Sequence, residues 1–122
     1  MASERYEDCF IYVRGADDRA ALCELLQRFL GATAELWTLT LTGFEIDIRK
    51  NKRRQPQPED DFVNWPTMVE VYADASTSDR EMVDLTSRLM VFLRSSGFPN
   101  VAACDFEDEL PQLDYVRDLP PP

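Results

Sequence analysis

The densest group of potentially reactive side chains in this sequence is a run of carboxylates near its C-terminal end. The run consists of Asp105, Glu107, Asp108 and Glu109. Carboxylate oxygens bind Mg²⁺ or Ca²⁺, and paired carboxylates perform acid–base chemistry. The run contains no glycine and lacks the spacing of an EF-hand calcium loop. Three interpretations are open: a solvated acidic turn, an acidic patch that docks on a basic partner, and a metal or catalytic site.

The residue types that are missing exclude several mechanisms. The 122 residues include no histidine, which removes Ser-His-Asp and Cys-His catalysis in their usual forms and every His-containing zinc site. The 4 glycines stand singly, at 15, 31, 43 and 97, so there is no glycine-rich loop for a nucleotide phosphate. We therefore expect a protein that is not an enzyme, with no catalytic residues, no metal and no cofactor.

The cysteines are the other reactive side chains. Cys9, Cys23 and Cys104 form an odd set without repeated spacing, which argues against a disulfide framework. We expect buried, reduced thiols in a cytoplasmic protein. No apolar run approaches the length of a membrane span, and the acidic N-terminal residues do not resemble a secretory signal.

Charge is unevenly distributed along the chain. The net charge is −10, yet five of the 13 basic residues fall between Arg49 and Arg54, and the remaining 8 basic against 23 acidic residues leave −15 elsewhere. We expect the basic run to pair with the following acidic residues, 59–61, or to be solvated. An acidic surface attracts cationic partners and repels nucleic acid and anionic membranes. We therefore expect a protein partner, with neither nucleic acid nor a membrane.

Two aromatic residues, Phe62 and Trp65, follow the acidic residues 59–61. They either close the edge of the core or anchor an interface, where tryptophan is enriched. The predicted partner-binding residues are Asp60, Asp61, Phe62, Trp65, Asp105, Glu107, Asp108 and Glu109.

Hydrophobic periodicity predicts two helices and four strands. The first helix covers residues 17–30, with an aspartate N-cap and Gly31 beyond its end. The second begins at a capping box formed by Ser78 and Glu81 and ends before Gly97. The predicted strands cover residues 9–13, 36–49, 67–72 and 101–104.

The segment 36–49 has two possible structures. Apolar residues alternate up to Leu41, and after Gly43 the alternation resumes one residue out of phase, from Phe44. A bulge at Thr42–Gly43 would keep one face along a single long strand, whereas a tight turn would give two strands. We favour the bulged strand.

This order of elements predicts an α+β fold. It matches the split βαβ, or ferredoxin-like, pattern: a four-stranded antiparallel sheet with both helices on one face. We expect a single domain over residues 1–122, with an ordered core over about 8–111 and an extended proline-rich tail over 112–122. The open face of such a sheet is often covered by a second copy, so a homodimer is an alternative.

Three stretches carry a family resemblance: residues 43–51, residues 61–71 and, most specifically, the segment 101–111. Together they resemble small acidic actinobacterial proteins, most of them uncharacterised, and they are also similar to immunity proteins that neutralise polymorphic or contact-dependent toxins. The resemblance implies a cytosolic binding protein, an immunity protein that blocks a basic toxin. A self-associating protein or a carboxylate- or metal-dependent enzyme is the alternative.

Overall fold

The computed structural model describes residues 6–51 and 62–111, which fold around one antiparallel sheet. The predicted tail 112–122 and the predicted site residues Asp60 and Asp61 lie outside the described residues. In chain order the elements are β1 (Asp8–Val13), α1 (Arg19–Leu30), β2 (Thr33–Glu35), β3 (Thr38–Leu41), β4 (Phe44–Lys50), the 3₁₀ turn η1 (Phe62–Asn64), β5 (Thr67–Ala73), α2 (Asp79–Ser95), β6 (Asn100–Ala103) and the 3₁₀ turn η2 (Glu107–Glu109).

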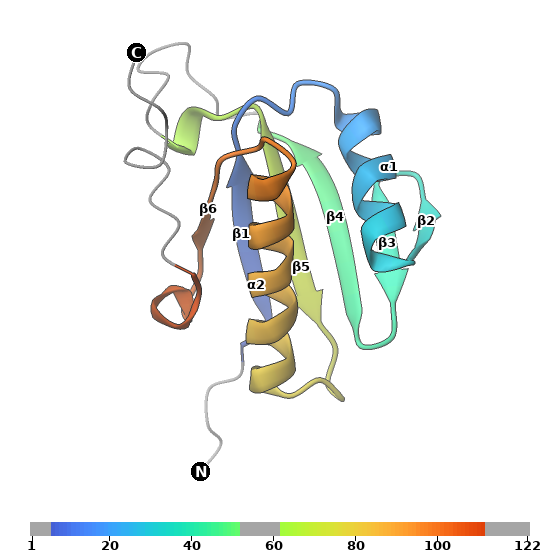
Figure 1. The fold of residues 1–122 in the computed structure, drawn as a ribbon. Helices are drawn as coiled ribbons and strands as arrows, with labels where there is room; N and C mark the ends of the chain where they lie inside the picture. Colours follow the sequence, from blue (N-terminus) through green and yellow to red (C-terminus); the bar gives the residue numbers. More distant parts are fainter. Residues whose placement is uncertain (1–5, 52–61, 112–122) are drawn as a thin grey trace.

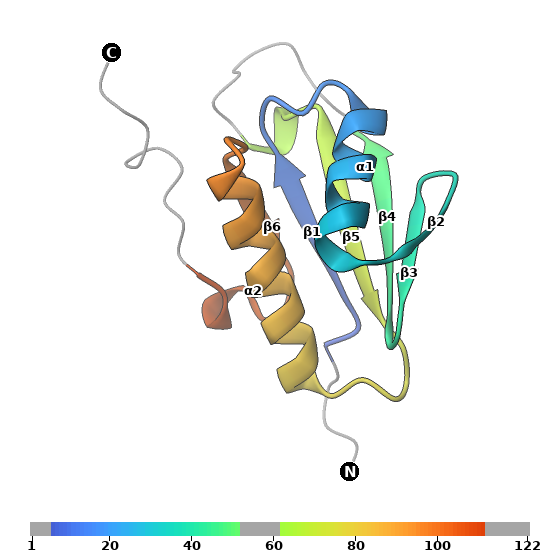
Figure 2. The ribbon, with the colours of Figure 1, turned by 45° about the vertical axis from the view of Figure 1, so that its right-hand side comes forward.

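The sheet has six strands in the order β2-β3-β4-β5-β1-β6, and every pair is antiparallel. Both helices lie on the same face of the sheet, α1 over β3 and β4, and α2 alongside β6 (Figures 1 and 2). The predicted α+β class is confirmed. The predicted four strands are wrong, because the segment between α1 and β5 forms three strands rather than one.

The bulged strand predicted over 36–49 is a hairpin instead. Leu41 pairs with Phe44 across a two-residue turn, and Leu39 pairs with Ile46. The change of phase at Gly43 therefore marks a reversal of the chain, which brings both apolar sets to one face. Gly43 has φ +86, and a Cβ there would meet the Thr77 hydroxyl at 2.6 Å, so the turn requires glycine.

A second hairpin precedes this one. The strand predicted to begin at residue 36 is preceded by β2, and Leu36 and Trp37 form the turn between β2 and β3. Leu36 adopts a left-handed backbone with φ 54, which is unusual for a residue with a side chain. Sequence periodicity gives no sign of this turn, because neither residue is a typical turn residue.

The core lies between the sheet and the helices. Alternate residues of β1 and β5 point into it, including Ile11 and Val69, and the apolar stripes of the two helices cover them. Phe29 of α1 stacks on Phe92 of α2 at 3.9 Å between ring centroids, which joins the helices directly. None of the described helices has the length and apolar character needed to cross a membrane.

Both helices begin as their sequences predict. The Asp18 side chain accepts a hydrogen bond from the Ala21 amide at 3.0 Å. In α2 the Ser78 hydroxyl accepts from the Glu81 amide at 3.1 Å while the Glu81 carboxylate accepts from the Ser78 amide at 2.9 Å. The capping box is therefore confirmed.

Candidate functional site

The acidic run lies in an ordered turn after β6. Asp105, Glu107, Asp108 and Glu109 are all exposed, whereas Phe106 between them is buried in the core. The turn is held from two sides, by the Cys104 amide, which donates to the Glu107 carboxylate at 3.4 Å, and by the ring of Tyr6, which stacks on Phe106. The predicted acidic turn exists, and its position is fixed by aromatic packing beneath it.

Tyr6 connects this turn to the start of α2. Its hydroxyl donates to the Glu109 carboxylate, and its backbone amide donates to Asp79 at 2.9 Å. The hydrogen bond to Glu109, followed by desolvation and by the charges of Glu109, Asp79 and Asp105, raises the pKa of Tyr6 to about 12. Through these two hydrogen bonds Tyr6 lies between the carboxylates of Glu109 and Asp79.

The carboxylates do not converge into a metal site. Within residues 6–51 and 62–111, no group of three or more His, Cys, Asp or Glu side chains is placed to hold an ion. The acidic run points outward from η2 instead.

The turn η1, which begins at Phe62 and is followed by Trp65, packs on β1 at the end opposite the acidic run (Figure 1). Trp65 is only 2% exposed, and its carbonyl accepts a hydrogen bond from the Asn51 side chain at 2.8 Å. Phe62 packs edge-on against Tyr12, 5.3 Å between centroids, and lies edge-on to Trp65. Trp65 therefore closes the edge of the core, and it does not lie near the acidic run 105–109.

The exposed tryptophan is Trp37, in the turn between β2 and β3. Leu36 is 87% exposed and Trp37 is 37% exposed, and Val91 is the remaining large apolar residue exposed on the described part of the chain. The guanidinium of Arg19 lies 3.8 Å from the centre of the Trp37 ring, close enough for a cation–π contact. This contact holds the indole against the first turn of α1.

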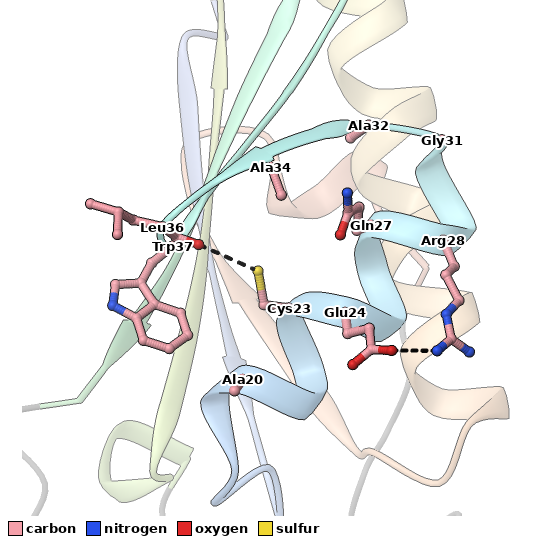
Figure 3. A pocket seen from close by; sticks show the side chains of 10 residues that line it. All are labelled: Ala20, Cys23, Glu24, Gln27, Arg28, Gly31, Ala32, Ala34, Leu36 and Trp37. Atoms are coloured by element: carbon pink, nitrogen blue, oxygen red, sulfur yellow. Dashed lines mark hydrogen bonds and ion pairs between the residues drawn. The ribbon is translucent and has the colours of Figure 1, made fainter.

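A shallow groove runs beside this turn, between α1 and the hairpin (Figure 3). It has a volume of about 810 Å³ and is lined by Ala20, Cys23, Glu24, Gln27, Arg28, Gly31, Ala32, Ala34, Leu36 and Trp37. The Cys23 thiol donates to the Leu36 carbonyl at 3.9 Å, which ties the turn to α1, and Glu24 pairs with Arg28 along the helix. We call Arg19, Cys23, Leu36 and Trp37 the hairpin site.

The sheet face opposite the helices carries a network of charges. Arg49 pairs with Glu70 at 3.1 Å and with Asp47 at 3.4 Å, and it donates to the Tyr72 hydroxyl. Burial, followed by the hydrogen bond and charge of Glu70, raises the pKa of Tyr72 to about 12. The first residue of the basic run therefore pairs with carboxylates of β4 and β5, whereas Lys52, Arg53 and Arg54 lie outside the described residues.

The hairpin site is the part of the surface that sequence reasoning missed. Alternation placed Trp37 on the same face as the buried Leu39, whereas in the structure Trp37 precedes β3 and is 37% exposed. Exposure was the missing information. A one-dimensional pattern of apolar residues does not show how much of a side chain its tertiary neighbours leave exposed.

Comparisons of this chain with models of protein families, with curated proteins and with solved structures give no match. The resemblance to immunity proteins therefore stays a prediction. The functional conclusions below rest on the geometry of the chain itself.

Proposed function

We propose that this is a non-catalytic binding protein that docks on a partner protein through the hairpin site. The exposed, left-handed Leu36 carries the proposal. A left-handed backbone costs roughly 1–2 kcal/mol in a residue with a Cβ, and a leucine that is 87% exposed regains little of this by burial. A strained residue whose side chain is mostly exposed in the isolated chain points to a role in contact with another molecule.

The neighbours of Leu36 have the chemistry of an interface centre. Tryptophan and arginine are the residues most enriched among those that dominate binding energy. Trp37 and Arg19 are held together by their cation–π contact, so little side-chain freedom is left to lose on binding. The adjacent groove offers space for an apolar side chain of the partner.

A non-catalytic role is supported by the chemistry that the chain lacks. The sequence has no histidine and no glycine-rich loop. The carboxylates in the described ranges do not gather into an ion site. A cytoplasmic location is part of the proposal, and the three free cysteines suit it.

The fold supports the choice of site. We propose that β1, α1, β4, β5, α2 and β6 form a split βαβ unit, because the strand order β6-β1-β5-β4 is that of the ferredoxin-like pattern. The strands β2 and β3 are then an addition at one edge, and this addition carries Leu36 and Trp37 of the hairpin site. Functional residues are commonly carried by such additions to a rigid scaffold.

The test is affinity capture from the native host with the full chain as bait. We expect the Trp37→Ala and Leu36→Asp variants to lose the partner by about 30-fold or more each, the size expected for a hot-spot residue. The matched control is Val91→Asp, since Val91 is 48% exposed but lies on α2. Retention of the partner by both hairpin variants, or its equal loss in the control, would contradict the proposal.

The class of partner is a finer proposal, which rests on the acidic run. We propose a cationic protein of the toxin type that the immunity resemblance implies. The exposed carboxylates of η2 lie at the β6 edge of the sheet, opposite the edge that carries the hairpin site (Figure 1). Charges that lie outside the contact surface steer a basic partner toward the protein. They raise its association rate more than its final affinity.

Kinetics separate the two parts of the proposal. We expect charge reversal of Asp105, Glu107 and Asp108 to lower the association rate at low salt and to leave dissociation nearly unchanged. Trp37→Ala should act the other way, through faster dissociation. An association rate that changes with neither salt nor charge reversal would contradict the proposal that the partner is cationic. It would not contradict the proposal that the partner binds at the hairpin site.

A further inference from the structure

We infer that Cys9 and Cys104 form a reversible disulfide, which makes this pair a redox modification site between the first and the last strand. Both thiols are free in the structure. The site lies at the end of β6, apart from the hairpin site. It does not depend on the proposed binding function.

The strand register brings the two cysteines opposite each other. β1 and β6 pair Phe10 with Ala103, so the next residues along the same antiparallel register are Cys9 and Cys104. Residues that face each other across an antiparallel pair point to the same side of the sheet. Residues 95 positions apart in the chain are therefore neighbours in space.

The hydrogen-bond pattern places them at a closely spaced position. The Arg14 amide donates to the Pro99 carbonyl at 2.9 Å, which makes that pair a hydrogen-bonded one. Bonded and non-bonded pairs alternate, so Cys9 and Cys104 fall at a non-bonded position, and the Cys104 amide bonds Glu107 instead. The Cα atoms of non-bonded pairs lie about 4.5 Å apart, within the range that a disulfide spans.

The two thiols differ in access and in acidity. Cys9 is fully buried on the helix-covered face, whereas Cys104 is partly exposed and packs against the core. A hydrogen bond from the Cys9 thiol lowers the pKa of Cys104, while its interaction with Cys104, followed by burial, raises the pKa of Cys9. Cys104 is therefore the thiol that an oxidant reaches first, and Cys9 is the resolving partner.

The chemistry needs a peroxide as the oxidant. The Cys104 thiolate attacks one oxygen of hydrogen peroxide, the O–O bond breaks, and hydroxide leaves, which gives a sulfenic acid at Cys104. The sulfur of Cys9 then attacks the sulfenic sulfur, and the hydroxyl group leaves as water with the thiol proton of Cys9. A small dithiol reverses the reaction by exchange.

The test uses the full chain, treated with hydrogen peroxide and then unfolded and alkylated. We expect one alkylated cysteine, Cys23, together with a peptide that joins Cys9 to Cys104 and a mass lower by about 2 Da for the two lost hydrogens. The crosslink closes nearly the whole folded chain into a loop, so Tm should rise by roughly 10 °C and fall back after dithiothreitol.

The third cysteine provides the matched control. Cys23→Ser should still form the crosslink, whereas Cys104→Ser should not, and Cys104→Ser is expected to fold because Cys104 is already partly exposed. A peroxide-treated chain that carries sulfinic acid at Cys104 with no bond to Cys9 would overturn the inference, as would a crosslink through Cys23. Peptide mapping of the peroxide-treated chain without substitutions shows whether Cys9 and Cys104 are joined, even if a variant fails to fold.

Discussion

The two edges of the sheet differ in whether their aromatic and apolar side chains are buried or exposed. At the β6 edge, Phe106 is buried under Tyr6 and only carboxylates face outward. At the β2 edge, Leu36 and Trp37 face outward and the polar contacts lie behind them. The aromatic ring at the β6 edge is buried, whereas the β2 edge exposes apolar side chains and carries a left-handed Leu36.

This difference suggests that the β6 edge contributes to folding and the β2 edge to binding. Solvated surface charges contribute little to folding, so the β6 edge is stabilised mainly by its buried ring. The hairpin contributes strain and exposed apolar area, neither of which stabilises the isolated chain. We expect substitutions at the β6 edge to act on folding and those at the β2 edge to act on binding.

The largest expected effect is at Phe106. Phe106→Ala removes a fully buried ring and should lower the free energy of unfolding by about 3–5 kcal/mol. Trp37→Ala removes a partly exposed ring and one cation–π contact, and should cost about 1 kcal/mol or less. Urea denaturation of both variants measures the difference. Equal losses would mean that the hairpin is a structural element, and the contrast between the edges would disappear.

At Leu36 we expect a smaller effect, in which one substitution increases stability relative to another. Leu36→Gly and Leu36→Ala both remove the exposed side chain, but only glycine relieves the left-handed backbone at φ 54. The glycine variant should be more stable than the alanine variant by about 0.5–1 kcal/mol, while both lose affinity for the partner. The urea midpoints of the pair supply the measurement. A less stable glycine variant would show that the turn is not strained.

The smallest effect is the pH dependence of the β6 edge. The hydrogen bond to Glu109, with the nearby carboxylates, raises the pKa of Tyr6 from 10.0 to about 12. A raised pKa stabilises the fold while Tyr6 is protonated, so this contribution is complete below pH 10 and is lost as the pH rises toward 12.

Tyr6→Phe keeps the ring on Phe106 but cannot donate to Glu109. Its stability should therefore show a weaker decline between pH 10 and 12 than that of the unsubstituted chain, a window set by the shifted pKa of Tyr6. Thermal unfolding between pH 10 and 12 measures this difference. Tyr72→Phe is the control, because the pKa of Tyr72 is also raised to about 12. Parallel curves for Tyr6→Phe and the unsubstituted chain would show that the hydrogen bond adds nothing.

Much of the fold was predictable because its signals are local. The box at Ser78 and Glu81 and the glycine after Leu30 depend on a few adjacent residues, and the structure has both. The turn at Gly43 was visible as a change of phase, but its interpretation depended on Thr77, which fills the space beside it and is distant in the sequence.

The candidate site was less predictable, because exposure is a tertiary property. Trp37 was predicted inside a strand and Trp65 beside one, yet Trp65 is 2% exposed with Phe62 edge-on to its ring, while Trp37 is 37% exposed. The acidic residues of η2 were predicted as a group since they are adjacent in the chain. Their separation from Trp65 required the strand order, which places the two features at opposite ends of β1.

The position of β1 between β5 and β6 has a consequence for how the chain is made. Ile11 pairs with Val69 on one side and with Ala102 on the other, so the strand synthesised first waits for both of its partners. At about 5–20 residues per second, β1 stays without its second neighbour for on the order of 5–20 s. During that time its row of unpaired amides and carbonyls is open to other chains, and completion of β6 ends the exposure. The last strand thus sets the time during which a nascent copy of this protein is vulnerable to aggregation.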